Sequence, residues 1–193
     1  TSAAGQFIYN HIEDVNPAWL HLDIAGPAFR DGRGTGHGAA LMAGLVRRLD
    51  GEGSRSDMLS VSVPARSQEY DQRTFQHHVS PGAFSDLLYK NSLYDKSRTI
   101  FSGLIFVDEG AHRTDAYQTC RNLFMSGDAE ANSMPGLEIN ADDVKCSHGS
   151  TSAQISDEEI FYLQARGIDP VRARQLIARG FSVEVIEKIG DEK

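Results

Sequence analysis

Two side chains that bind soft metals lie close together near residue 147 of this 193-residue chain. Cys146 and His148 are two positions apart, and Asp142 and Asp143 precede them. Thiolate sulfur and imidazole nitrogen are ligands that zinc, iron and copper accept. In a β-strand, residues two apart share one face, so Cys146 and His148 could act together on one metal or sulfur species. We take both residues as candidate metal and cofactor ligands.

A structural explanation of the same pair remains open. A single Cys-x-His lacks the second pair of ligands that a structural zinc site requires. A small buried cysteine, followed by a histidine in a turn before Gly149, also accounts for these residues. The spacing by itself favours this simpler explanation, so it does not establish a metal site.

Cys120 is a third candidate cofactor ligand. The guanidinium of the neighbouring Arg121 could lower the pKa of the Cys120 thiol, whereas burial would raise that pKa. His77 and His78 are adjacent in a strand-like run, so their side chains would point to opposite faces. We expect both histidines at an edge or on the surface rather than in one metal site.

Other catalytic and ligand-binding patterns are weak or missing. The glycine-rich stretch over 32–38 could bind an anion through its backbone amides, but it lacks the Gly-Lys-Ser/Thr ending of a phosphate-binding loop. A flexible turn is the simpler explanation of that stretch. The sequence contains neither a GxSxG elbow nor an HExxH pair, so the usual patterns of serine and zinc hydrolases are absent.

The composition is that of a globular protein, with 40% hydrophobic and 24% charged residues. The net charge of -8 argues against a nucleic-acid or anionic-membrane surface. No apolar run approaches the ~20 residues of a membrane helix, and the N-terminus lacks the pattern of a secretory signal. Two cysteines are too few for a disulfide framework. We expect a cytoplasmic protein whose partners are proteins or small ligands.

The elements that would position the candidate residues change along the chain. Residues 1–50 predict a short α/β segment that ends in a helix over about 39–49. The polar stretch 51–57 predicts a linker. From 58 to 155, short apolar runs alternate with turn signals, which predicts many short strands in a sandwich, barrel or β-solenoid. The expected turns include Pro81-Gly82, Asp108-Glu109-Gly110, Ser126-Gly127-Asp128 and Pro135-Gly136.

Residues 156–193 predict a small α-helical domain. Ser156 and Glu159 match a capping box at the start of a first helix. Asp169 as N-cap and Pro170 at the first helical position predict a second helix, which is expected to end at Gly180. Apolar residues spaced by four over 181–189 predict a third helix.

From about residue 58 to the C-terminus, the chain resembles the C-terminal part of the SufD family of iron–sulfur cluster assembly subunits. The resemblance covers roughly two-thirds of the chain, far more than a short motif. It rests on SDLLYK (85–90), KSR (96–98), FSGLI (101–105), TDAYQT (114–119), LEI (137–139), ADDVKCSHG (141–149), IFYL (160–163) and RGI (166–168).

This resemblance implies a right-handed parallel β-helix over 58–155, followed by the helical domain, in a non-enzymatic scaffold. It also implies pairing with a SufB-like subunit through the β-helix and docking of a SufC-like ATPase on the helices. An iron–sulfur cluster would be held transiently on that complex, and ATP would be bound only by the partner ATPase. His148 matches a histidine proposed to hold the nascent cluster, with Cys146 beside it. Cys120 departs from the usual SufD pattern, which leaves a sulfur-accepting role open.

The first fifty residues resemble a different family, the C-terminal segment of leucyl aminopeptidases, through WLHLDIAGPA (19–28) and RGTG (33–36). In that family, the residues that bind the two metals lie upstream of this segment. Without them no metal-bound hydroxide would form. A metal-dependent aminopeptidase remnant and a fused composite without native activity are therefore the alternatives to the scaffold.

Overall fold

The computed structural model describes residues 29–30, 33–34 and 43–190 and divides the chain into two units after Gly38. In the first unit, β1 (Phe29–Arg30) and β2 (Arg33–Gly34) form an antiparallel pair. Most of the aminopeptidase-like segment and of the glycine-rich stretch lies outside the described residues. The interpretations of both segments therefore stay predictions.

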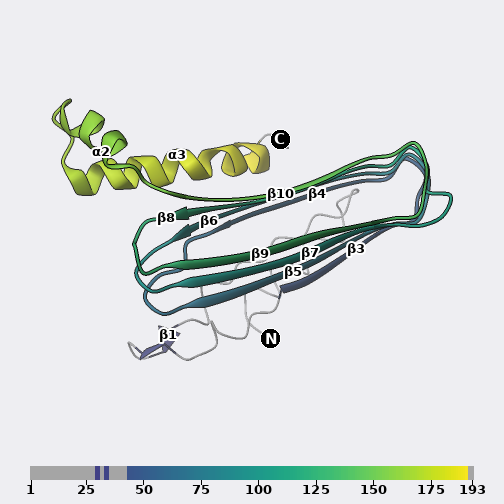
Figure 1. The fold of residues 1–193 in the computed structure, drawn as a ribbon, viewed down its shortest axis with the longest axis horizontal. Helices are drawn as coiled ribbons and strands as arrows, with labels where there is room; N and C mark the ends of the chain where they lie inside the picture. The colour runs from purple at the N-terminus through teal and green to yellow at the C-terminus, as the bar shows by residue number, and fades with distance from the viewer. Residues whose placement is uncertain (1–28, 31–32, 35–42, 191–193) are drawn as a thin grey trace. The chain divides into compact units, whose positions relative to one another are not determined.

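The second unit is a parallel β-solenoid, in which the chain winds alternately through two facing sheets (Figure 1). All neighbouring strands within each of the two sheets are parallel. This confirms the predicted mainly β fold built from β-helix rungs. Sheet I has the order β3 (Ala43–Leu49), β5 (Glu69–His78), β7 (Arg98–Val107) and β9 (Glu130–Ile139). Sheet II has the order β4 (Arg55–Ser62), β6 (Phe84–Leu93), β8 (Asp115–Phe124) and β10 (Lys145–Gln154).

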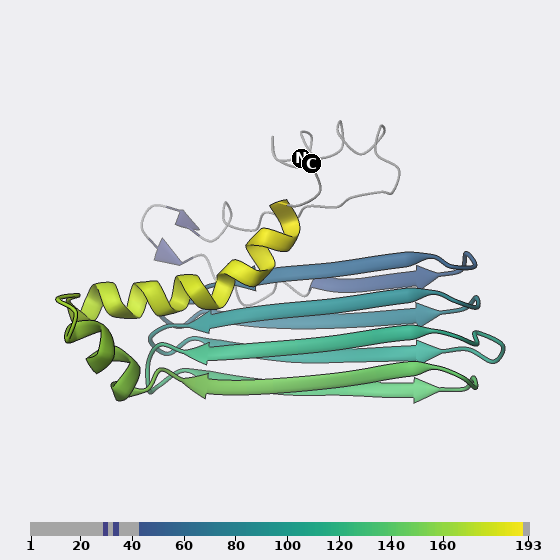
Figure 2. The ribbon, with the colours of Figure 1, turned by 90° about the horizontal axis from the view of Figure 1, so that it is seen from above.

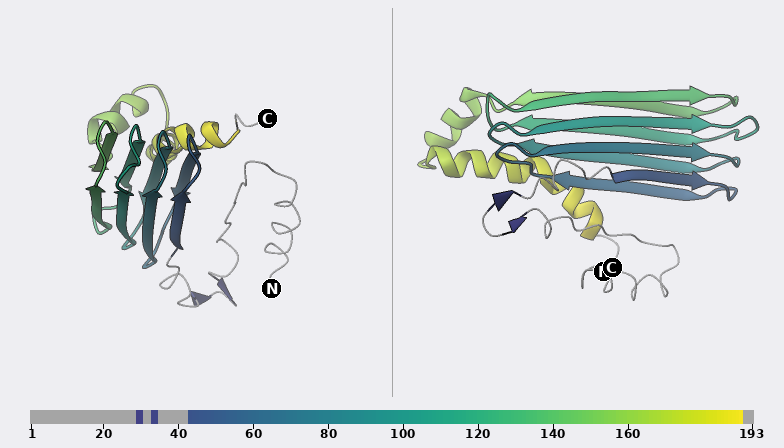
Figure 3. Two further views of the ribbon diagram at one scale, coloured as in Figure 1. Left: turned by 90° about the vertical axis from the view of Figure 1, so that its right-hand side faces the viewer. Right: turned by 90° about the horizontal axis from the view of Figure 1, so that it is seen from below.

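The turns that join the strands stack along two opposite sides of the solenoid, where the strands end (Figure 3). Gly82 (φ +68°) and Gly110 (φ +83°) adopt left-handed conformations, which favour glycine, in two of the predicted turns. The turn predicted at Pro135-Gly136 is wrong, because both residues lie inside β9. In the described sheet β9 is an edge strand, where a proline that donates no ladder hydrogen bond is tolerated.

The helix predicted over 39–49 is also wrong, because residues 43–49 form strand β3. Leu45 and Leu49 are four apart, a spacing that fits one face of a helix and equally one face of a strand. Pairing of β3 with β5 decides between the two, and it places this segment in the solenoid. The predicted linker is shorter than expected, since β4 begins at Arg55. The division of the first fifty residues into a separate domain remains a prediction.

Two helices follow the solenoid. α2 (Asp157–Gln164) has the predicted capping box between Ser156 and Glu159. α3 (Pro170–Gly190) has the predicted N-cap, since Asp169 Oδ1 accepts hydrogen bonds from two backbone amides. The predicted break at Gly180 is absent and the last two expected helices are one. Gly180 does not take the left-handed conformation of a helix end, and Val185 beyond it is fully buried, which favours continuation. No helix in the described part of the chain is long and apolar enough to cross a membrane.

Polar side chains in the solenoid interior form a ladder along sheet II. Ser62, Asn91, Asn122 and Ser152 occupy the same register position in β4, β6, β8 and β10. Ser62 Oγ donates to Asn91 Oδ1 (2.6 Å), Asn91 Nδ2 donates to Asn122 Oδ1 (2.8 Å), and Asn122 Nδ2 donates to Ser152 Oγ (3.3 Å). Each rung thereby satisfies amide groups that would be costly to bury unpaired.

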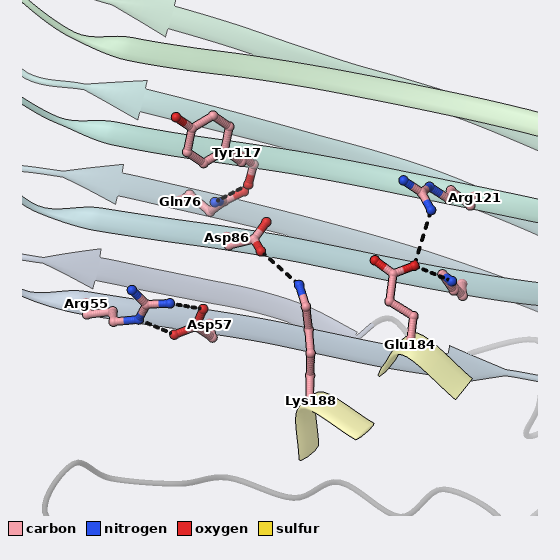
Figure 4. Close-up of polar contacts among 9 residues, drawn as sticks. Arg55, Asp57, Gln76, Asp86, Tyr117, Arg121, Glu184 and Lys188 are labelled. Atoms are coloured by element: carbon pink, nitrogen blue, oxygen red, sulfur yellow. Dashed lines mark hydrogen bonds and ion pairs between the residues drawn. The ribbon is translucent and has the colours of Figure 1, made fainter. Parts of the chain in front are cut away.

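The C-terminal half of α3 lies over the outer face of sheet II (Figure 2) and is held there by ion pairs (Figure 4). Lys90 Nζ lies 2.6 Å from Glu184 Oε2 and donates to the carbonyl of Phe181 at 2.7 Å. Glu184 also meets Arg121 on β8 at 3.3 Å, and Lys188 meets Asp86 on β6 at 3.4 Å. The hydrogen bond from Lys90 holds the pKa of Glu184 below its usual value.

Replacing Glu184 with glutamine is expected to lower the free energy of unfolding by about 1 kcal/mol. The Lys90 side chain is only 5% exposed and would lose its carboxylate partner. The cost is limited because the Glu184 side chain is 45% exposed. Since the folded-state pKa of Glu184 is lowered, this stabilisation is present at neutral pH and is lost as the pH falls through that pKa.

Urea denaturation of the two proteins measures this difference. Glu187→Gln removes the same charge from an exposed position of the same helix and is expected to leave the unfolding free energy nearly unchanged. Equal effects of the two substitutions would show that the contact between Glu184 and Lys90 does not stabilise α3 on the sheet.

Candidate functional site

β10 places Cys146 and His148 on the same face of the last described rung. In the parallel register, Cys146 lies opposite Ala116 and His148 lies opposite Gln118. Ala116 and Gln118 are fully buried between the sheets, so the two candidate ligands continue interior columns of the solenoid. Among the described strands, none lies beyond β10 in sheet II. His148 is therefore exposed and Cys146 is half-buried.

The environment of Cys146 favours the neutral thiol. Its side chain packs against the cluster formed by Ile105, Val107, Ala111 and Ala116. Burial raises the pKa of Cys146, and the nearby Asp115 carboxylate raises it further. Because a metal binds the thiolate, an iron ion at this site would have to displace the thiol proton.

The aspartates that precede the pair do not complete a metal site. Across the described residues, no three His, Cys, Asp or Glu side chains gather closely enough to hold a metal ion. Asp142 lies in the turn before β10, where its backbone meets His112 Nδ1 at 3.1 and 3.3 Å. Cys146 and His148 could thus supply at most part of a coordination shell, and other ligands would have to come from another molecule.

Cys120 lies in the interior on β8, the strand next to β10, and its register partner Ser150 is two residues beyond His148. It is fully buried, and its sulfur lies 3.7 Å from Asn91 Nδ2 and 3.9 Å from Asn122 Oδ1. Burial raises the pKa of Cys120 to about 11. Of the two effects left open by the sequence, burial decides the direction, since neighbouring strand residues point to opposite faces and Arg121 pairs with Glu184 outside.

His77 and His78 point to opposite faces of β5, as predicted, but only one lies near the surface. His77 is half-buried on the outer face, with Nε2 2.9 Å from Asp108 Oδ2. His78 is fully buried, so its expected place at an edge or surface is wrong. Burial lowers the pKa of His78 to about 4, with a smaller contribution from His77.

Sequence reasoning missed the polar interior and the role of Lys90. Alternate β5 residues at 72, 74, 76 and 78 are all polar and all buried, a pattern easily taken for a solvent-facing strand side. Lys90 is covered by α3, and it donates to the carbonyl of Phe181, which lies 91 residues further along the chain. One signal in the sequence pointed to a covered outer face: Leu88, two residues before Lys90 on the same side of β6, is apolar, and it is buried as well.

Comparison with known proteins agrees with this architecture. Residues 31–181 match the family described as "SUF system FeS cluster assembly, SufBD core domain". The chain is 42% identical over 155 residues to iron-sulfur cluster assembly protein SufD of Escherichia coli, which covers 80% of this chain and 37% of that protein. It is 34% identical over 138 residues to SufBD family protein slr0076 of Synechocystis, covering 72% of this chain and 30% of the relative.

A plant relative is similar to this chain over a shorter stretch. Protein ABCI7, chloroplastic, of Arabidopsis thaliana is 41% identical over 95 residues, which cover 49% of this chain and 20% of the relative. The chain thus spans less than two fifths of the length of these relatives. The family match begins in the first unit and runs through the solenoid into α3. On this evidence the chain belongs to the SufBD family of the SUF iron–sulfur cluster assembly system.

Proposed function

We propose that this chain is a scaffold part of an iron–sulfur cluster assembly subunit and has no enzymatic activity of its own. It pairs with a SufB-like subunit at the β10 end of the solenoid and docks a SufC-like ATPase on α2 and α3. An iron–sulfur cluster is held transiently at the paired end, and ATP is bound only by the partner ATPase. Family membership and the names of the relatives, which are assembly proteins, support this proposal.

The observation that carries the proposal is the placement of Cys146 and His148 on the exposed inner face of the last described rung. The neighbouring edges of β9 and β10 carry unpaired backbone groups in the described structure, and such edges readily accept strands of another chain. A subunit that pairs there would cover the incomplete ligand pair and could add the missing ligands. A role for Cys120 requires in addition that the interior opens.

Replacing His148 with alanine is expected to lower the yield of assembled cluster about tenfold or more, because the exposed imidazole is one of few available ligands. The measurement is the absorbance of the cluster after iron and sulfide are added, without oxygen, to this chain with a SufB-like and SufC-like pair. Cys146→Ser is expected to act in the same direction.

Ser147→Ala is the matched control, because Ser147 is exposed on the opposite face of the same strand. It is expected to leave the cluster yield unchanged. An unchanged yield with His148→Ala, in a complex that still forms, would exclude His148 as a ligand. Failure of the complex to form would instead contradict the proposed pairing surface.

The helices expose large apolar side chains that a protein partner could cover. Phe161 (70% exposed) and Tyr162 lie on α2, and Val171 lies on α3. Five charged residues of the helical segment are exposed as well, and they are Glu158, Arg166, Arg172, Arg174 and Arg179. Large exposed apolar groups with a charged rim are typical of protein interfaces. This supports docking of the ATPase on the helices.

Changing Phe161 and Val171 to serine together is expected to weaken ATPase binding by tenfold or more, measured by calorimetric titration. Val63→Ser is the control, since Val63 is an exposed apolar residue outside the helices. Unchanged affinity of the double variant would place the ATPase elsewhere.

A further inference from the structure

Five polar side chains form a cluster between the two sheets. Thr74, Gln76 and His78 occupy alternate positions of β5, Ser85 belongs to β6, and Gln118 belongs to β8. All five are buried, and Gln76, His78, Ser85 and Gln118 are fully buried. We call this set the interior polar cluster. Gln118 lies opposite His148 in the register of β8 and β10, but the proposed function does not use the cluster.

Hydrogen bonds fix the orientation of the Gln76 amide. Its Nε2 lies 2.8 Å from Ser85 Oγ. It also lies 3.3 Å from the carbonyl oxygen of Tyr117 (Figure 4). A carbonyl oxygen can only accept, so Nε2 and not Oε1 must face Tyr117. The amide therefore donates to both partners, and Gln76 Oε1 points elsewhere.

The same bonds fix the tautomer of His78. His78 Nε2 lies 2.8 Å from Ser85 Oγ. Within the described residues, the Ser85 hydroxyl meets only Gln76 and His78, and it already accepts from Gln76. The buried hydroxyl also needs an acceptor for its own hydrogen, and His78 Nε2 is the one available among its described partners, so we assign this hydrogen to His78 Nε2. A neutral imidazole carries one N–H, which must then lie on Nδ1.

Three atoms of the cluster are left without a partner. Gln76 Oε1, His78 Nδ1 and Gln118 Nε2 are buried and form no hydrogen bond with any described protein atom. They follow one another along the cluster: His78 comes two residues after Gln76 on β5, and Gln118 lies on the other side of Gln76, where its Oε1 accepts from Thr74 Oγ1 at 3.5 Å. Buried polar groups in native proteins are nearly always paired, and ordered water pairs those that side chains leave.

We propose that the interior polar cluster is a binding site for ordered water molecules enclosed between the sheets. The unpaired atoms are one acceptor, Gln76 Oε1, and two donors, His78 Nδ1 and Gln118 Nε2, and none of these groups is charged. A metal cation would be repelled by the two N–H donors, and an anion would meet the Gln76 oxygen without a compensating positive charge. Water accepts and donates hydrogen bonds, so it is the ligand that fits this set.

Two measurements on the full chain test this proposal: a high-resolution crystal structure and nitrogen-15 NMR of the histidine rings. Water is expected within hydrogen-bond distance of His78 Nδ1 and Gln76 Oε1, and His78 is expected as the Nδ1–H tautomer. An interior that contains no water, or a His78 ring with its proton on Nε2, would overturn the proposal.

The variant Gln118→Leu gives a second test in solution. Leu87 occupies the position opposite Gln118 on β6, so this column of the interior already accepts leucine. Oxygen-17 relaxation dispersion is expected to show fewer long-lived water molecules in the variant, and its urea midpoint is not expected to rise. Thr151→Ala, at an exposed position of β10, is the control and should change neither quantity.

The opposite result has a clear meaning. If the cluster is dry, Gln118→Leu removes an unpaired amide at no cost. The urea midpoint would then rise, and the relaxation dispersion would equal that of the parent chain. That combination would overturn the proposal, and it would leave the assembly function untouched, because cluster yield depends on other residues.

Discussion

Between pH 6.5 and pH 4, the free energy of unfolding is expected to fall by up to about 3 kcal/mol through His78 alone. The pKa of His78 is about 4 in the folded chain, because burial disfavours the imidazolium, and its ordinary value is 6.5. In this window the unfolded state binds a proton that the folded state does not. Stability therefore rises with pH through the window and is lost as the pH falls.

The variant His78→Leu isolates this contribution. Leu49 and Val107 occupy the positions opposite His78 on β3 and β7, so an apolar side chain suits this column. Urea denaturation at several pH values is expected to give a flatter dependence for the variant between pH 6.5 and pH 4.

Gln76→Leu is the matched control, because it changes the neighbouring interior position and removes no titratable group. The control is expected to keep the slope of the parent chain. If His78→Leu and the parent chain lose stability in parallel over this window, His78 is not the group responsible.

The rung architecture could be foreseen in part because its signals are local. Turn residues such as Gly82 mark where each strand ends, and the capping box of Ser156 and Glu159 marks the start of α2. The period of two along a strand placed Cys146 and His148 on one face before the fold was known. A local pattern misleads when two structures share it, as the four-residue spacing of Leu45 and Leu49 shows for β3.

The interior chemistry could not be foreseen, because its partners come from other rungs. Asn91 meets Gln72 at a sequence separation of 19 and Asn122 at 31. From the sequence alone, a polar residue at every second position of a strand is expected to face solvent, and only the register of the sheets shows that it faces the interior. The exposure of His148 depends likewise on β10 being the last described strand of its sheet, which no property of the residue itself reveals.

Contacts between rungs also predict a large loss of stability when Gly103 is replaced by a residue with a side chain. This glycine lies on β7 at an inward position, opposite Thr74 on β5. A Cβ added there would lie 2.7 Å from Gln118 Cδ and 2.7 Å from Thr74 Oγ1, and it would also press on Gln118 Oε1. All three residues are held between two sheets, so the neighbours have little room to move.

Gly103→Ala is expected to lower the free energy of unfolding by about 2–3 kcal/mol through overpacking of the interior. Urea denaturation at neutral pH measures the loss. Gly149→Ala is the matched control, since Gly149 also lies within a strand and an added Cβ there meets no atom within 4 Å. The control is expected to change the unfolding free energy by less than about 0.5 kcal/mol.

A double-mutant cycle shows whether the side chain of Gln118 is the cause. Shortening Gln118 to serine removes the atoms that the new methyl group would meet, so the double variant should be more stable than the sum of the two single losses predicts. The expected coupling is about 1 kcal/mol or more, because the two sites are in contact. If the two losses simply add, the side chain of Gln118 is not the reason why position 103 requires glycine. The overpacking caused by Gly103→Ala would then come from other contacts.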